Sequence, residues 1–496
     1  MLIALLIIIF LLIWSVRSER MPGPTPIPFF GNSLQIKSHP NGVLQYFVEN
    51  CKRFGPVTRF WIGSKPLVMI TDFDDIEILL RTLDHTKKSI TYDYIKPLLG
   101  EGLVTASGKG WHSDRKMLTP AFHYDIIKRF LHIFRGRVEI LLENLEEKVG
   151  GDVFDVHELI IGYSLNAMIE SAMGITLDLE NERNSTYRKA LKTVLRLCQD
   201  RTFNPFWRSD FVFRRSKAGS EFFQCLDIIN DFSMNIINER RRQLKDADYS
   251  QLMIDENGEE MKKPFLDSML MDGTFSDQKI LDQVNTIIFA GHESIANGIS
   301  FTLYNLGQNQ DVQRKVYEEL LMTCGRNLHH FTATNFRETK YMNMVLRETF
   351  RMYPSVPVFG RYVESDLKLK NTTITAGTSV SCFAYLSHRN PEVFPDPEVF
   401  DPERFADESR RGRHAYAQIP FSAGPRSCIG QKFALVQVKL VLGEVLRRYA
   451  ILPGQKIGQI RSMFTLKPEG GIRIRVRRRS SSVVMIFTYR RGTWNS

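Results

Sequence analysis

Paired cysteines, which would indicate a disulfide framework or a zinc site, are lacking in this 496-residue chain. Its six cysteines are scattered without a C-x-x-C pair, at positions 51, 198, 225, 324, 382 and 428. The cysteine nearest to Cys428 is 46 residues away, and no C-x-x-C-H run occurs. This spacing excludes a zinc cluster and the usual attachment of c-type haem at Cys428. Scattered thiols in so large a chain favour a reducing compartment.

Acidic residues are lacking from position 473 onward, where seven arginines stand without one Asp or Glu. The net charge of +11 comes mainly from this stretch, because 66 basic residues minus these seven leave 59 against 55 acidic residues. A nucleic-acid site needs Lys and Arg clustered on the folded surface, so a terminal run gives that class of function little support. A basic patch that binds an acidic redox partner remains open.

Charge is also lacking at the N-terminus, where residues 1–16 are apolar apart from Ser15. A membrane span usually needs about 20 apolar residues, and about 17 suffice when a Trp such as Trp14 lies at the interface. We predict a transmembrane signal anchor over residues 1–16, with Arg17 and Arg20 placing the remaining chain in the cytosol. A cleaved secretory signal is the alternative, although no positive segment precedes the run and no A-x-A site ends it.

No linker or repeat divides the chain between residues 29 and 479. Four prolines within residues 22–28 predict an extended, proline-rich spacer over 17–28. Residues 57–72 predict a β-hairpin, whereas 165–175, 222–244 and most of the remainder show helical periodicity. We therefore predict a mainly α domain with a small β region over 29–479. The polar stretch 246–264 is expected to be an exposed loop, and residues 480–496 form a basic, polar tail whose role the sequence does not decide.

The stretch "FSAGPRSCIG" surrounds Cys428 with residues that constrain a loop. Gly424 and the proline after it predict a tight turn, Gly430 permits close backbone approach, and Arg426 brings positive charge that favours a thiolate. An amphipathic helix is expected to start directly after Gly430. A lone cysteine is more often an inert core residue, but a thiolate in a tight loop before a helix suits an axial haem ligand.

This stretch resembles the haem-binding signature of the cytochrome P450 haem-thiolate monooxygenases, F-x-x-G-x-R-x-C-x-G. The matching residues are Phe421, Gly424, Arg426, Cys428 and Gly430. The resemblance implies the fold of that family and haem b bound through Cys428. It also implies that electrons from NADPH arrive through a reductase, with cytochrome b5 as a further partner.

Glu348 and Arg351 stand three residues apart in "ETFR", where a pair by itself would be a surface contact worth about 0.5 kcal/mol or less. The segment 394–405 resembles the family's segment whose arginine, here Arg404, completes a buried triad with that Glu and Arg. Such a triad holds the loop that leads to Cys428, so its implied role is structural.

Residues 281–307 contain no proline and predict a helix of roughly 40 Å, whose charged and amide side chains exclude a second membrane span. Gly291 is costly in mid-helix and indicates either a helix–helix contact or the close approach of another group. "AGHES" resembles the family's oxygen-binding groove, with Glu293 as the acid and Ser294 in place of the usual threonine. The resemblance implies that Glu293 and Ser294 deliver protons.

"WHSDR" resembles the family's W-x-x-x-R, in which Trp111 and Arg115 meet the haem propionates. A Trp and an Arg on a helix surface are the alternative. Arg361 matches the position of another propionate-binding arginine. Asp114 stands where relatives often have a basic residue, which puts the charge of this neighbourhood in doubt.

The quoted runs are most similar to the microsomal branch known for fatty-acid ω-hydroxylation. Many of its members carry a glutamate that esterifies the haem, where this chain has Ala290, so we expect a non-covalent haem. The implied protein is a single-pass enzyme of the endoplasmic reticulum membrane that oxidises a fatty acid, terpenoid or foreign compound. Residues 89–104, 288–295, 355–359 and 463–466 are the expected pocket walls. A peroxide-rearranging enzyme of the same fold and a non-catalytic haem protein that binds a lipid or gas are the alternatives.

Overall fold

The computed structural model describes residues 21–176, 182–246, 263–324, 338–409, 411–460 and 464–479. The expected anchor, nearly all of the expected loop at 246–264 and the expected tail at 480–496 lie outside these residues. Within the part of the chain that is described, no helix has the length and apolar character needed to cross a membrane.

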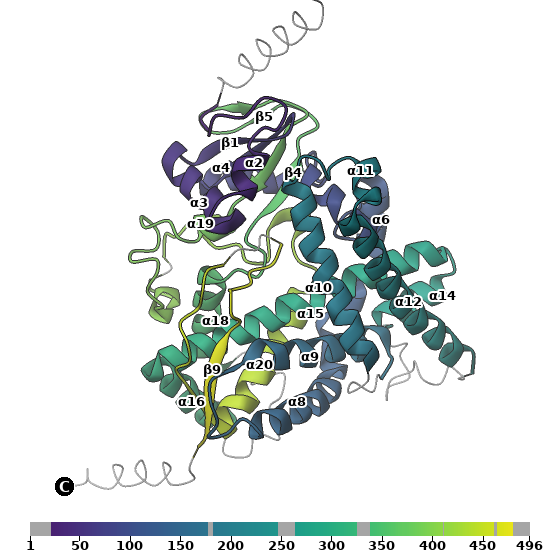
Figure 1. Ribbon diagram of the computed structural model, residues 1–496. Helices are drawn as coiled ribbons and strands as arrows, with labels where there is room; N and C mark the ends of the chain where they lie inside the picture. Colours follow the sequence, from purple (N-terminus) through teal and green to yellow (C-terminus); the bar gives the residue numbers. More distant parts are fainter. Residues whose placement is uncertain are drawn as a thin grey trace, which may run out of the picture.

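Helices form most of the molecule, as the sequence predicted (Figure 1). The α-helices are α2 (Ser33–Lys37), α3 (Gly42–Phe54), α4 (Phe73–Arg81), α5 (Lys96–Leu99), α6 (Gly108–Leu118), α7 (Tyr124–Arg129), α8 (Leu131–Glu146), α9 (Val156–Met168), α10 (Glu182–Phe203), α11 (Asp210–Arg215), α12 (Lys217–Asp246), α14 (Phe265–Asp272), α15 (Asp277–Gln308), α16 (Gln310–Cys324), α18 (Lys340–Met352), α19 (Ala384–Ser387) and α20 (Gln431–Arg448). The short 3-10 helices are η1 (Ile90–Tyr94), η2 (Thr119–Phe122), η5 (Pro402–Phe405), η6 (Ala415–Ala417) and η7 (Gly424–Arg426), and the π-helix η3 (Ile169–Met173) extends α9.

The strands form small sheets at the edge of this helical body. They are β1 (Val57–Ile62), β2 (Lys65–Ile70), β3 (Phe154–Asp155), β4 (Phe359–Tyr362), β5 (Leu367–Lys368), β6 (Thr373–Ile374), β7 (Ser379–Cys382), β8 (Tyr449–Leu452) and β9 (Arg473–Arg478). The largest sheet has the order β1-β2-β7-β4, with β1 and β2 antiparallel and β2 parallel to β7. The hairpin predicted at 57–72 is therefore confirmed. Strands β7 and β4, from a distant part of the chain, complete the sheet beside it.

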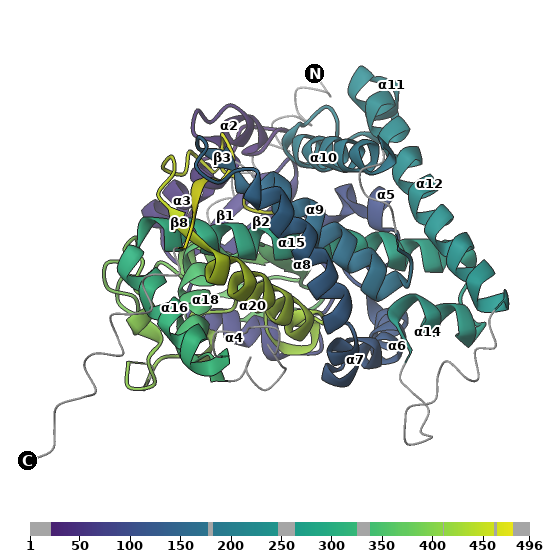
Figure 2. The ribbon, with the colours of Figure 1, turned by 90° about the horizontal axis from the view of Figure 1, so that it is seen from below.

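Helix α15 runs through the centre of the molecule, with α9 and α20 packed along it and α8 packed on those two helices (Figure 2). Its 32 residues correspond to about 48 Å of helix. The Ser276 side chain accepts a hydrogen bond from the Lys279 N–H and so caps the first turn. Among the buried polar groups that argued against a membrane span, the carboxylate of Asp282 accepts from the Glu101 N–H at 2.8 Å, whereas the side-chain amide of Asn297 has no hydrogen-bond partner. The prediction for 281–307 is confirmed.

One expectation about local structure needs correction. Helix α20 begins directly after Gly430, as predicted, but residues 436–446 are buried on every side of the helix, so it is not amphipathic there.

The described part of the spacer, residues 21–28, has no helix, and it packs on the body. The Pro22 carbonyl accepts from the Arg59 N–H of β1 at 2.8 Å, and a Cβ at Gly23 would lie 2.0 Å from the Arg59 carbonyl oxygen.

Candidate active site

The loop before α20 is held in place by backbone contacts that only glycine allows. Gly424 has a φ of 68°, and a Cβ there would lie 1.9 Å from the carbonyl oxygen of Leu80 at the end of α4. The Cys428 N–H donates to the Phe421 carbonyl at 2.9 Å, which closes the turn. Gly430 has an ordinary negative φ, and a Cβ there would meet the Cys428 sulfur only at 4.0 Å. The loop therefore needs Gly424 more than Gly430.

The Cys428 thiol lies deep in the molecule but is exposed to a cavity that it lines. Burial raises the pKa of this thiol, while the Gly430 N–H and the charge of Arg115 act to lower it. Arg426, expected from the sequence to favour the thiolate, instead donates to the carbonyls of Thr86, Leu103 and Ala106. The cation that acts on the sulfur is therefore supplied by α6 and not by the cysteine loop.

The cavity above Cys428 has a volume of about 350 Å³ and mostly apolar walls. All four segments expected as walls contribute, although Met463 of the last one lies outside the described residues. Sequence reasoning missed the contributions of α3, β2, α9 and α10, because single apolar residues in these elements carry no motif. No Asp or Glu is found among the described residues that line the cavity.

A group of buried and half-buried cations lies beside the cavity. Lys88 and Arg426 line it; Arg361 pairs its backbone with that of Lys88 and is only 3% exposed. Burial lowers the pKa of Arg115, Arg361 and Lys88, and that of Arg426 to about 9. The Arg426 guanidinium also stacks over Trp111 at 4.2 Å. The sequence had indicated all of these except Lys88, which belongs to no motif.

These cations have no carboxylate partner among the described contacts, although buried charges are costly unless paired. An apolar macrocycle with two carboxylate groups would fill the apolar space and supply the missing negative charge. The residues present therefore fit haem, with the thiol of Cys428 on one wall of the same cavity.

Asp114 does not disturb this group of cations. Its carboxylate forms an ion pair with Lys279 at 2.6 Å and accepts from the Gln283 side chain at 2.9 Å. Both partners lie on α15, so Asp114 joins α6 to the central helix. The doubt that the sequence raised about the local charge is removed by these contacts.

Helix α15 presents Ala290, Gly291 and Ser294 to the cavity. The Ser294 hydroxyl donates to the Ala290 carbonyl at 2.7 Å. A Cβ at Gly291 would lie 1.9 Å from the terminal methyl carbon of Met168 on α9. Gly291 thus permits a helix–helix contact, one of the two alternatives that the sequence left open, and also lines the cavity.

Glu293 is not brought to the cavity wall with Ser294. It is 2% exposed, and its Oε1 lies 2.5 Å from the Lys467 Nζ and 3.3 Å from the Thr465 hydroxyl, which donates to it. Burial acts to raise the pKa of Glu293. The charge of Lys467, together with smaller contributions from His292 and His157, acts in the opposite direction and outweighs burial, so the pKa lies below its usual value. Thr465 lines the cavity and links Glu293 to it.

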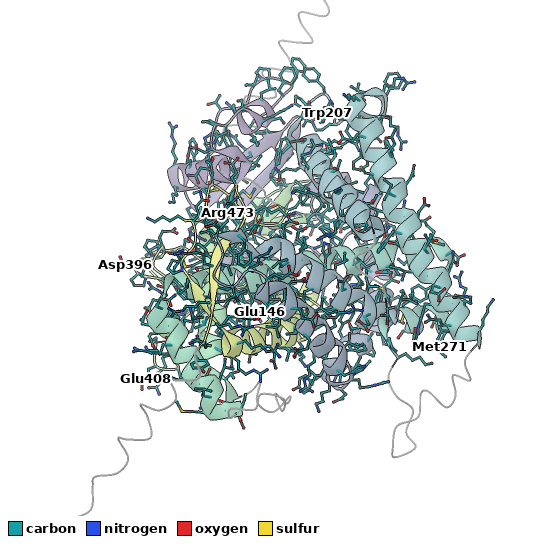
Figure 3. All side chains as sticks on the ribbon, turned by 60° about the horizontal axis from the view of Figure 1, so that its bottom comes forward. Glu146, Trp207, Met271, Asp396, Glu408 and Arg473 are labelled. Atoms are coloured by element: carbon teal, nitrogen blue, oxygen red, sulfur yellow. The ribbon has the colours of Figure 1, made fainter. Side chains whose placement is uncertain are left out.

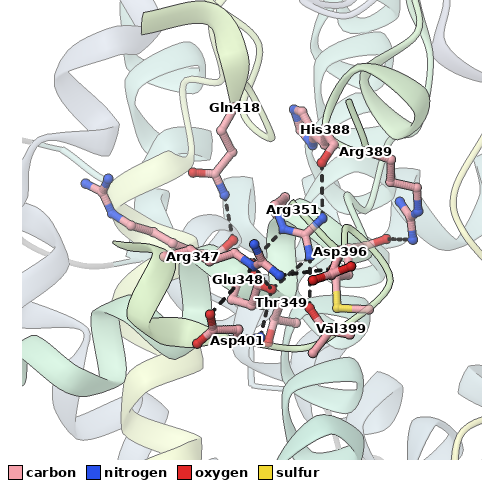
Figure 4. A network of polar contacts seen from close by, with 12 residues as sticks. Arg347, Glu348, Thr349, Arg351, His388, Arg389, Asp396, Val399, Asp401 and Gln418 are labelled. Atoms are coloured by element: carbon pink, nitrogen blue, oxygen red, sulfur yellow. Dashed lines mark hydrogen bonds and ion pairs between the residues drawn. The ribbon is translucent and has the colours of Figure 1, made fainter. Parts of the chain in front are cut away.

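The buried triad joins α18 to the segment 394–405, and Figure 4 shows the polar contacts around Glu348 and Arg351. Arg351 and Glu348, both fully buried, form two parallel hydrogen bonds of 2.7 and 2.8 Å. Arg404 lies 3.5 Å from the Glu348 carboxylate and donates to the Asp396 carbonyl at 3.0 Å. These contacts of Arg404 hold the segment around residues 394–405 against α18.

His388 extends this network and was missed in the sequence. Its carbonyl accepts from Arg351 at 3.1 Å, and its Nε2 accepts from the Ile419 N–H at 2.9 Å. The triad is thus connected to the chain two residues before Phe421. The only sequence signal is the run "HRNPEVF", which does not reveal the distant partner.

Comparison with known proteins identifies the family. The family model described as "Cytochrome P450" matches residues 21–474. "Probable cytochrome P450 4s3" of Drosophila melanogaster is 35% identical over 469 residues, which cover 92% of each chain. "Cytochrome P450 4V2" of Mus musculus is 34% identical over 472 residues, covering 91% of this chain and 88% of the relative.

"Cytochrome P450 4c21" of Blattella germanica is 33% identical over 437 residues, covering 87% of each chain. The number 4 follows "cytochrome P450" in the names of all three relatives. The family model and these relatives confirm the resemblance to cytochromes P450 that the sequence motifs indicated. Members of the family bind haem b through a cysteine thiolate. The chain therefore belongs to the cytochrome P450 family and is a haem-thiolate monooxygenase that takes electrons from NADPH through a reductase and acts on lipophilic substrates.

Proposed function

We propose that Cys428 is the thiolate ligand of the haem iron in this monooxygenase. The observation that carries this assignment is that one cavity combines the Cys428 thiol, apolar walls and buried cations without carboxylate partners. The Gly430 N–H and Arg115 stabilise the thiolate form. Phe421 orients the loop through its carbonyl and packs edge-to-face on Phe350 at 5.7 Å.

Trp111, Arg115, Arg361 and Arg426 hold the haem propionates, and we add Lys88 to this set. Burial disfavours the charged form of each cation, so the binding of an anionic group beside it is favourable. Because Ala290 has no carboxylate and no acidic residue lines the described cavity, the haem is held without an ester bond. Glu348, Arg351 and Arg404 support the loop and take no part in the chemistry.

Haem, when bound, supplies the iron centre at which dioxygen is reduced and one of its oxygen atoms is transferred to the substrate. The chain binds the substrate between apolar walls and controls protons. The Ser294 hydroxyl donates to the Ala290 carbonyl, so its oxygen lone pairs are left to accept a proton or a water hydrogen from the cavity. Serine keeps the hydroxyl of the usual threonine but lacks the methyl group that limits its rotamers, so its proton is held less rigidly.

The substrate class is a lipophilic molecule such as a fatty acid, terpenoid or foreign compound. The test combines the purified holoprotein with reductase, NADPH and a panel of these lipids under ¹⁸O₂. We expect one labelled oxygen atom in the product, and cytochrome b5 is added in a second series to measure its effect on coupling. A haem-loaded protein that consumes NADPH but forms no oxygenated product from any lipid class would contradict the proposal.

We also propose a single-pass anchor over residues 1–16 in the endoplasmic reticulum membrane, with the catalytic domain, 29–479, in the cytosol. Besides the apolar run, large apolar side chains are exposed at Phe29, Phe206, Phe211 and Val212. Phe206 contacts Phe30, 6.0 Å between ring centroids. Trp207 lies at the end of the molecule that carries the N-terminal β region (Figure 3). Such aromatic residues suit a membrane interface.

Deletion of residues 1–20 tests this topology. We expect much of the protein to leave the membrane fraction with its haem spectrum intact, and some to remain because of the exposed aromatic surface. Secretion of the full-length chain with residues 1–16 removed would contradict the anchor.

A further inference from the structure

The two cations that line the cavity, Lys88 and Arg426, are engaged by other groups of the chain. The Arg426 guanidinium donates to three backbone carbonyls. The Lys88 ammonium group lies 4.7 Å from the centroid of the Tyr92 ring, and the Lys88 backbone bridges to Arg361. Both cations belong to the set assigned above to the haem propionates. No other Lys or Arg occurs among the described residues that line the cavity, so a substrate carboxylate finds no cation of its own there.

The charge of a head group therefore matters for binding in this cavity. Transfer of a carboxylate from water to mostly apolar walls is unfavourable unless a cation or several hydrogen-bond donors meet it. Burial without such partners raises the pKa of a carboxyl group, so a fatty acid would bind mainly in its neutral form. A neutral polar head group avoids this desolvation cost, provided that its hydrogen bonds are satisfied.

Two uncharged polar side chains, Gln199 and Thr202, lie on the wall of the cavity that α10 forms. Residues three positions apart share one face of a helix, so both side chains can reach one head group. The Thr202 hydroxyl donates to the Cys198 carbonyl at 2.8 Å, which leaves the Thr202 oxygen to accept a hydrogen bond. The Gln199 amide has both donors and acceptors. The pair suits a group that donates and accepts, as an alcohol does, whereas a carboxylate only accepts.

Contacts outside the cavity hold this part of α10 in place. The Phe203 ring packs against Phe47 of α3, with 6.0 Å between ring centroids. Arg201 is not among the described lining residues, because its side chain donates to the Trp207 carbonyl at 2.9 Å and pairs with Asp210. In Figure 2, α10 and α20, the helix that follows the cysteine loop, lie on either side of α15. The polar pair thus belongs to a fixed wall that carries no positive charge toward the cavity.

We propose that Gln199 and Thr202 bind a neutral hydroxyl head group, so that the substrate is a lipid alcohol and not a lipid carboxylate. This deepens the monooxygenase function proposed above and rests on it. The substrate hydroxyl donates to the Thr202 oxygen and accepts from the Gln199 amide, while the apolar walls contact the hydrocarbon part. The reaction R–H + O₂ + NADPH + H⁺ → R–OH + NADP⁺ + H₂O then adds a second hydroxyl and leaves the head group unchanged.

The first test measures binding without turnover, by equilibrium dialysis of the haem-loaded protein with radiolabelled dodecanol or dodecanoate. The dissociation constant of dodecanol should be the same at pH 6 and pH 8. That of dodecanoate should rise by about tenfold per pH unit, because only the protonated acid can donate to Thr202 and enter without a cation. Dodecanoate that binds more tightly than dodecanol at pH 8, or equally at both pH values, would overturn the proposal, since a cation would then recognise the carboxylate.

The second test uses variants of α10 and dodecyl methyl ether, which accepts hydrogen bonds but cannot donate one. Thr202→Val keeps the side-chain shape and should weaken dodecanol binding about three- to tenfold, with no change for the ether. Thr202→Ser should bind dodecanol as wild type does, and Gln199→Leu should weaken the binding of both ligands. Thr193→Val makes the same change on α10 at a residue that is not among the described lining residues, and it should match wild type. Equal dodecanol binding in Thr202→Val and wild type would overturn the proposal.

Turnover separates a failure of this proposal from a failure of the monooxygenase function. A protein that binds dodecanol through Thr202 but forms no oxygenated product from any lipid, with reductase and NADPH present, would contradict the monooxygenase function and leave the head-group site standing. Oxygenated product from dodecanoate but none from dodecanol would contradict the head-group site and leave the monooxygenase function standing.

Discussion

Replacing Glu348 by Gln tests the buried triad with the least change in shape. Glu348 accepts both parallel hydrogen bonds of Arg351 and a third from the Asp401 N–H at 2.9 Å. A glutamine amide turns one acceptor into a donor that faces the guanidinium and removes the negative charge. Arg351 is fully buried and keeps only the carbonyls of His388 and Val399 among these partners. An uncompensated buried charge of this kind costs about 3–5 kcal/mol.

Glu398→Gln is the matched control. Its carboxylate also pairs with a buried arginine, Arg389, at 3.0 Å, but it is 70% exposed. Water can take over the lost contact, so the expected cost is about 1 kcal/mol or less. The two variants therefore share the chemical change and differ in burial.

The measurement is the midpoint of urea unfolding, taken at equal haem loading. Midpoints are compared because a protein with a bound cofactor does not unfold in a simple two-state transition. With an m value of about 3 kcal/mol/M, the midpoint of Glu348→Gln should fall by roughly 1 to 2 M, and that of Glu398→Gln by a third of a molar or less. Folded, haem-loaded Glu348→Gln should keep its thiolate-type spectrum. Equal midpoints for the two variants would refute the assignment of a stabilising triad.

Three further results are expected. Ser294→Ala should raise the share of NADPH oxidised to hydrogen peroxide in a paired assay of product and peroxide, because a cavity hydroxyl is lost; unchanged coupling would mean that Ser294 only packs. Haem should separate from the polypeptide in denaturing chromatography, since Ala290 offers no carboxylate; haem that stays with the protein would reveal another covalent link. Burial, with the charges of Arg389 and Arg351, lowers the pKa of His388 to about 3. Below pH 6.5, His388 is therefore protonated in the unfolded chain but stays neutral in the folded chain. The free energy of unfolding is at its full value above pH 6.5 and falls by about 1.4 kcal/mol per pH unit as the pH decreases toward 3. Urea midpoints between pH 7 and 5 should show a flatter slope in His388→Gln, and an identical slope would exclude His388 as its source.

The sequence predicted the local parts of the site well. Gly424 has a left-handed backbone, so the turn expected at "AGPR" follows from the residue types. The span of α15 follows from an uninterrupted helical pattern without proline. In both cases the determining interactions lie within a few turns of one element.

Contacts between distant segments could not be predicted in the same way. Lys88 reaches the cavity because its backbone bridges to Arg361 in β4, and Arg426 is directed away from the sulfur by carbonyls of residues 86–106. These partners depend on tertiary packing, which no local pattern encodes. The burial of α20 on every side likewise depends on which helices surround it.

The separation of Glu293 from Ser294 depends on tertiary packing, because other consecutive residues of α15, such as Ser294 and Ile295, do line the same cavity. The sequence did not reveal that Lys467 and Thr465 would meet Glu293 from a distant segment.

The central claim is that Cys428 ligates the haem iron, and the ferrous carbon monoxide spectrum tests it most directly. Haem-reconstituted Cys428→Ala should lack the red-shifted, thiolate-type absorption, while Cys225→Ala, at a half-buried cysteine that is not among the residues lining the cavity, should retain it. Survival of that absorption in Cys428→Ala would show that another residue supplies the thiolate and would contradict the account.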